Sequence, residues 1–309
     1  MTEAQHEQHI LAAANGHKIH LDLYLPDSEP TLILQVLHGL GEHAARYRRL
    51  ADAAAAEGLA LVIHNHRGHG PKAERPGYFA DDKGWQKLVE DALEVTEFAG
   101  KRFPNLPLVL LGHSMGSYIA QSFAMLHGGR LKGLILSAST WPSRAQLYPA
   151  WMLARGVAVT AGRTGHSALL DKLGFGDFNR RFEPARTELD WLSRDEAEVD
   201  KYVADPLCGG PYTVGLWLDL LGGLIEIASD HALSRIPADL PILIMGGQDD
   251  PVGGEDGMSN LAMHYAQSHH QRLTVRIYPE GRHEMFNETN RKEVTADMLD
   301  WIRRSVRKR

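Results

Sequence analysis

Short apolar runs alternate with helix-like segments over most of this sequence. The runs "TLILQVLHG" (31–39), "LALVIHN" (59–65), "LPLVLLG" (106–112) and "LKGLILS" (131–137) are almost uniformly apolar, as in strands that are buried on both faces. Amphipathic segments such as 84–103 lie between them. Strands and helices that alternate in this way fold into a mostly parallel sheet with helices on both faces, so the sequence predicts the α/β class.

The alternation has one interruption. An Asn15-Gly16 pair between two extended runs predicts an N-terminal hairpin. After residue 140 the pattern becomes one of helices and loops, and strands resume only at "LPILIMGG" (240–247) and "RLTVRIYPE" (272–280). We therefore expect a core built from residues 1–140 and 236–309, with residues 141–235 inserted as a helical cap.

Composition limits the partners and the compartment. A net charge of −6 gives no reason to expect nucleic acid, and no apolar run reaches the length of about 18 residues that a transmembrane helix needs. The start "MTEAQHEQHI" lacks the basic and apolar regions of a secretory signal. Cys208 is the single cysteine and has no partner for an intramolecular disulfide. We expect a cytoplasmic protein.

The segment "VLLGHSMGSYIAQ" (109–121) contains a Gly-x-Ser-x-Gly motif where an apolar strand turns directly into a helix. Such a sharp turn raises the serine hydroxyl above the sheet edge, and the flanking glycines relieve its crowding. Ser114 is therefore a candidate nucleophile, and the alternative is a serine in an ordinary glycine-rich connection.

A serine nucleophile needs a base that is oriented by an acid, and each should follow a later strand. The loops "GGQDDPVGG" and "EGRHEMFNE" follow the last two predicted strands and should lie at the same sheet edge as Ser114. His283 is the candidate base and Asp250 the candidate acid, with Asp249 as the alternative acid.

The reaction also needs N–H donors for a developing oxyanion. The Met115 amide lies at a helix N-terminus, where the helix dipole favours negative charge. The loop "HGLGEH" (38–43) supplies the second candidate, the amide of Leu40, while His38 and Glu42 have the character of residues that hold this loop by hydrogen bonds.

Five motifs together, "HGLGEHAARY", "NHRGHG", "GHSMG", "DDPVG" and "RHEMFNE", resemble the monoacylglycerol lipase and lysophospholipase branch of the α/β-hydrolases. The resemblance implies an eight-stranded core, a helical cap after the sixth strand, a serine-ester mechanism, and neither a metal nor an organic cofactor. It assigns Ser114, Asp250 and His283 as the triad and the Leu40 and Met115 amides as the oxyanion hole. One departure is Asn65, where many relatives carry Asp, and it concerns the local charge.

Two other classes compete with this interpretation. The spacing of His64, His66 and His69 matches the H-x-H-x-x-H pattern of a dinuclear zinc hydrolase, but Gly68 stands where that pattern carries Asp. A noncatalytic binder on the same fold is the second alternative, since fold does not fix function.

A proline-releasing peptidase would need an anion near the substrate amine. The candidate anions in the cap are Asp190, Asp195, Glu196, Glu198 and Asp200. Acids at the start of a solvated helix explain the same run.

An acyl-ester substrate is favoured by the apolar content of the cap. The residues predicted to line an acyl tunnel, or else to form the cap core, are Trp151, Met152, Leu153, Val157, Val159, Leu216, Trp217, Leu220, Leu221, Leu224 and Ile225. We expect hydrolysis of monoacylglycerol-like or other single-chain esters, with a lysophospholipase or general carboxylesterase as alternatives and transient contact of the cap with a membrane surface. The sequence does not indicate an oligomeric state.

Overall fold

The computed structural model describes residues 3–176 and 178–306. Eight strands form one sheet in the order β1-β2-β4-β3-β5-β6-β7-β8. The strands are β1 (Gln5–Ala12), β2 (Lys18–Leu25), β3 (Leu32–Leu37), β4 (Leu59–His64), β5 (Leu108–His113), β6 (Gly133–Ser137), β7 (Ile242–Gly247) and β8 (Leu273–Tyr278). The first two strands pair antiparallel through the predicted hairpin, β2 pairs antiparallel with β4, and the remaining pairs are parallel. The predicted α/β fold is confirmed.

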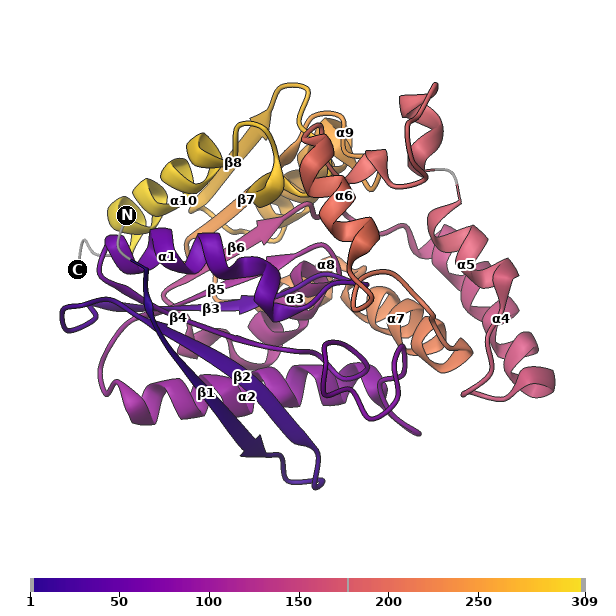
Figure 1. Cartoon of the computed structure of the whole chain (residues 1–309), viewed down its shortest axis with the longest axis horizontal. Helices are drawn as coiled ribbons and strands as arrows, with labels where there is room; N and C mark the ends of the chain where they lie inside the picture. The colour runs from indigo at the N-terminus through magenta and orange to yellow at the C-terminus, as the bar shows by residue number, and fades with distance from the viewer. Residues whose placement is uncertain (1–2, 177, 307–309) are drawn as a thin grey trace.

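Helices cover both faces of this sheet (Figure 1). Helices α1 (Arg48–Ala56) and α10 (Arg291–Ser305) pack on one face, and α2 (Gly84–Arg102), α3 (Met115–His127) and α9 (Gly254–Gln267) pack on the other. Strand β3 contributes to the hydrophobic core on each face of the sheet. Leu34 and Val36 join the core beneath α1 and α10, whereas Ile33 and Leu37 join the core beneath α2 and α3. This double burial explains the uniformly apolar strand sequences.

Strand β5 begins two residues later than the sequence predicted. Pro107 has no N–H to donate to the sheet, so the regular ladder starts at Leu108. The Pro107 carbonyl still accepts a hydrogen bond of 2.9 Å from the Ile33 N–H.

Between β6 and β7 the described chain is helical. The elements are α4 (Arg144–Ala161), α5 (Ala168–Phe175), α6 (Glu196–Ala204), α7 (Val214–Ile227) and α8 (Asp230–Leu233), with 3₁₀ turns η3 (Phe178–Phe182) and η4 (Asp190–Leu192). Helices α4 and α5 lie far from the sheet in Figure 1. Helix α7 anchors the group, since a Cβ at Gly223 would collide with the Trp85 ring of α2.

None of the helices in residues 3–176 and 178–306 combines the length and the apolarity that crossing a membrane would require.

Candidate active site

Ser114 occupies the turn between β5 and α3. Its backbone has φ +50° and ψ −120°, a strained conformation for a residue with a side chain. The close approach of α3 to β3 makes glycine necessary beside it, because a Cβ at Gly116 would collide with the Leu37 carbonyl. The strain and the neighbouring glycine are those of a nucleophile elbow.

His283 lies after β8 and Asp250 after β7, and the structure brings their side chains together. The Nδ1 of His283 is 2.9 Å from Oδ1 and 3.0 Å from Oδ2 of Asp250. Both residues are only 4% exposed. The neighbouring Asp249 instead pairs with Arg181 at 2.5 Å, away from the imidazole. Of the two candidate acids, Asp250 is therefore the one in contact with His283.

Leu40 and Met115 lie in two different segments beside Ser114. Leu40 is in the loop after β3 and lines the same cavity as Ser114 and His283, while Met115 is the first residue of α3. A Cβ at Gly39 would come within 3.3 Å of the Ser114 Cβ, so this loop passes directly beside the serine.

Buried side chains fix the loop that carries Leu40. Glu42 Oε1 accepts the Gly39 N–H at 2.6 Å and the Tyr47 hydroxyl at 2.8 Å, as the sequence predicted for Glu42. His38 lies within 2.8 Å of the Gly39 carbonyl through Nδ1, and its Nε2 accepts the His66 N–H at 3.0 Å. Hydrogen bonds inside the loop, and one to His66 in the loop after β4, thus hold the Leu40 loop in place.

His66 and His69 use ring nitrogens on backbone groups. The Nε2 of His66 lies 3.2 Å from the His38 carbonyl, and the Nε2 of His69 accepts the Gly41 N–H at 3.3 Å. These contacts give both rings a structural role around the Leu40 loop. Asn65 Oδ1 accepts the Ala44 N–H at 2.9 Å, so this neutral side chain supplies the acceptor here.

A network of charged side chains lies next to His283 and includes Glu284, the residue that follows it. Arg46 pairs with both Glu42, at 3.0 Å, and Glu284. Burial opposes the protonation of His283, but the charge and hydrogen bond of Asp250, helped by Glu284 and Glu42, outweigh it and raise the pKa of His283. Burial lowers the pKa of the adjacent His113 to about 4, which keeps that ring neutral.

Ser114 and His283 line a cavity of about 470 Å³. Its apolar wall combines residues of α5, η3 and η4 with others from α6 and from the loops after β3, before α7 and after β7, and comprises Leu40, Phe175, Phe178, Leu189, Trp191, Leu192, Tyr202, Tyr212 and Val252. Trp191 also contacts His283, since the two ring centroids lie 5.0 Å apart and the Trp191 carbonyl accepts the His283 backbone N–H at 3.4 Å. The lining includes Glu42, Asp171, Glu188 and Glu284 and, among the described residues, neither Lys nor Arg.

The predicted tunnel residues do not form this wall. Met152 and Val159 are 57% and 87% exposed on α4, whereas Leu216 and Trp217 are buried in the core shared by α7 and α2. None of the eleven residues proposed from the sequence lines the cavity beside Ser114. Helical spacing identified apolar faces but could not distinguish the face toward the cavity from the others.

The acids proposed to bind a peptide amine have other partners. Asp195 accepts the Ala197 N–H at the start of α6 and pairs with Arg291, and Glu198 pairs with Arg49 at 2.6 Å. Asp190, Glu196 and Asp200 gather around Arg186. Asp195 therefore caps α6, and the other acids of this run form ion pairs with arginines.

The fold and this arrangement define an α/β-hydrolase of the serine type. The chain belongs to the hydrolase family described as "Serine aminopeptidase, S33", whose model matches residues 28–290. The resemblance to the monoacylglycerol lipase branch is likewise confirmed by sequence relatives. The chain is 28% identical to a monoacylglycerol lipase of Mycolicibacterium smegmatis, over 98% of this chain and 99% of that protein. It is 27% identical to the human monoglyceride lipase, over 97% and 90% of the two chains.

Solved structures agree with the sequence relatives. A thermostable carboxyl esterase from Bacillus coagulans, solved in complex with glycerol, superimposes with a TM-score of 0.90 at 26% identity, covering 99% of this chain and all of that one. A monoglyceride lipase from Saccharomyces cerevisiae shares the fold with a TM-score of 0.73.

Proposed function

We propose that this protein is a serine carboxylic-ester hydrolase that acts on monoacylglycerol-like, single-chain acyl esters. The observation that carries the proposal is the strained Ser114, which lines a mostly apolar cavity together with His283, while the His283 Nδ1 contacts Asp250. The relatives named monoacylglycerol lipase and carboxyl esterase support the same reaction.

In the proposed mechanism the Ser114 hydroxyl attacks the ester carbonyl while His283 takes its proton. The Leu40 and Met115 amides donate to the oxyanion, which the α3 dipole also favours. The alcohol leaves with the proton from His283, and a water activated by the same imidazole releases the fatty acid. Asp250 orients the imidazole and stabilises its cation.

The electrostatics of the cavity favour a neutral head group. Four carboxylates and neither Lys nor Arg occur among its described lining residues, so a phosphate close to the ester would find no Lys or Arg as a counterion. The aromatic wall suits an acyl chain. We therefore favour a glycerol ester over a lysophospholipid.

The test is hydrolysis of a p-nitrophenyl ester series from acetyl to palmitoyl, of 1-monoacylglycerol, of a lysophospholipid and of an aminoacyl anilide. Ser114→Ala should lose nearly all ester turnover while its circular dichroism stays unchanged. Medium or long esters and monoacylglycerol should be preferred. Wild-type rates in Ser114→Ala would refute the mechanism, and cleavage of the anilide alone would make the protein a peptidase.

We further propose that residues 141–235 act as a cap that meets lipid surfaces. Exposed apolar side chains on α4 and α5 support this, namely Tyr148, Met152, Leu153, Val159, Leu169 and Leu173. In a flotation experiment with neutral vesicles, the wild type should float with the vesicles, and a Met152→Asp, Val159→Asp variant should not.

We also propose a cytoplasmic location. The single free Cys208 suits a reducing compartment, and fractionation of the native host would test this.

A further inference from the structure

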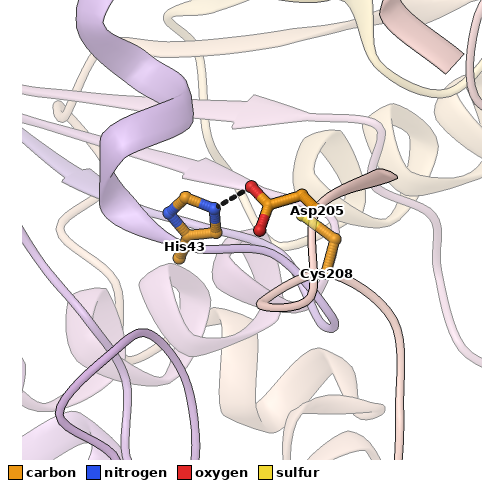
Figure 2. Close-up of side chains that lie close together, drawn as sticks. All are labelled: His43, Asp205 and Cys208. Carbon is orange, nitrogen blue, oxygen red and sulfur yellow. Dashed lines mark hydrogen bonds and ion pairs between the residues drawn. The ribbon is translucent and has the colours of Figure 1, made fainter. Parts of the chain in front are cut away.

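Three side chains with metal-binding atoms converge beside the Leu40 loop. His43 ends that loop, Asp205 directly follows α6, and Cys208 lies three residues further on (Figure 2). One nitrogen, one carboxylate oxygen and the sulfur lie within 4.8 Å of one another. The His43 Nε2 and the Asp205 Oδ2 are 2.8 Å apart. In the described part of the chain this is the one group of three such residues that is close enough to share an ion.

We propose that His43, Asp205 and Cys208 form a binding site for Zn²⁺, separate from the catalytic residues. Imidazole, carboxylate and thiolate are the ligands that zinc takes in proteins, and three protein ligands leave the fourth tetrahedral position for water. Zinc bond lengths place neighbouring ligand atoms roughly 3.5 Å apart, so the ion enters by opening the His43–Asp205 hydrogen bond and drawing the Cys208 sulfur inward.

The backbone around these ligands is already ordered. Asp205 Oδ1 accepts the Leu207 N–H at 2.9 Å, which leaves Oδ2 for the ion. The Cys208 N–H donates to the Asp205 carbonyl at 3.0 Å. The Gly209 N–H donates to the Gly41 carbonyl at 2.8 Å, so the two segments that carry the ligands are joined before any ion binds. Such hydrogen bonds around the ligands are what orient a metal site.

Charge and access also suit a cation. The carboxylates of Asp205, Glu42 and Glu284 add negative potential at the Cys208 thiol, and Arg46 opposes them. The His43 side chain is 8% exposed and the Asp205 side chain 30%, so an ion reaches the site past the carboxylate.

The binding test uses Co²⁺ as a spectroscopic substitute for Zn²⁺ on the full chain after chelation. Since Cys208 is the only cysteine in the sequence, a thiolate-to-cobalt charge-transfer band reports this site alone. We expect the band at one equivalent and its displacement by Zn²⁺. Cys208→Ser should abolish it, and His43→Gln or Asp205→Asn should weaken binding at least about tenfold. His6→Gln, which alters a similar pair between His6 and Asp22, is the matched control and should leave the band unchanged.

Alkylation of Cys208 by iodoacetamide gives a second readout, and its wild-type arm does not depend on the folding of any variant. Zn²⁺ should slow alkylation of the wild type at least about tenfold and should protect Asp205→Asn much less. The proposal is wrong if Zn²⁺ binds to the protein but does not protect Cys208 and Co²⁺ gives no thiolate band. The bound zinc would then occupy surface histidines. Neither readout involves ester turnover, so the outcome is independent of the catalytic proposal.

Discussion

The two adjacent aspartates after β7 differ in what their carboxylates touch. Asp250 is buried on His283, whereas Asp249 pairs with Arg181 and its side chain is 33% exposed. Asp250→Asn should therefore lower kcat/KM by about 10⁴, because the amide favours the wrong tautomer of the imidazole. Asp249→Asn is the matched control and should stay within about threefold, since an exposed ion pair contributes little. Equal losses in the two variants would reassign the acid.

The raised pKa of His283 fixes the direction of the pH dependence. In the proposed mechanism only the neutral imidazole can take the Ser114 proton, so kcat/KM should fall as the pH drops through the pKa of His283, which lies above the ordinary 6.5. In Asp250→Asn the main group that raises this pKa is gone and burial still lowers it, so the residual activity should persist to lower pH. The measurement is a pH–rate profile with a neutral ester. An unmoved acidic limb in Asp250→Asn would contradict this electrostatic account.

At the scale of elements, the sequence predicted the parts whose geometry depends on local chemistry. Strands buried on both faces have no polar alternation, and the Ser114 turn requires small neighbours, so β3 to β7 and the elbow could be located. The cavity wall could not be located in this way. Much of it comes from the end of α5 and the 3₁₀ turns that carry Phe178 and Trp191, and such turns have no long periodicity for a sequence pattern to reveal.

A pair of substitutions can show whether the acyl chain lies against η3 or against α4. Phe178→Ala in η3 removes apolar contact with an acyl chain and should raise KM for a medium-chain ester about tenfold, with kcat nearly unchanged. Leu153→Ala in α4, at a position that the sequence predicted to line the tunnel, should leave KM within about twofold, because Leu153 is 39% exposed and lies outside the cavity wall. The reverse ranking would move the acyl chain to α4.

Several histidines are buried in the interior of the molecule in the neutral form. His64 and His113 are each buried, and burial lowers the pKa of each to about 4. The pKa values of His38 and His66 also lie well below the ordinary 6.5, for the same principal reason, the loss of solvation. Each ring takes up its proton more readily in the unfolded chain, near pH 6.5, than in the folded one. The folded state therefore binds fewer protons, and its stability must decrease as the pH falls from 6.5 toward 4.

His64 tests this effect most directly. Both of its ring nitrogens are buried without a hydrogen-bond partner in the described residues, and its contact with His66 is a ring edge at 4.9 Å. A group whose pKa changes from 6.5 to about 4 on folding removes about 2 kcal/mol of stability between pH 6.5 and 4.5. His64→Leu should therefore reduce the loss of unfolding free energy over that interval by about this amount in urea titrations. The control is His231→Gln, at an exposed position of α8, which should keep the wild-type loss. If His64→Leu loses as much unfolding free energy between pH 6.5 and 4.5 as the wild type, His64 is not among the groups that make the fold sensitive to acid.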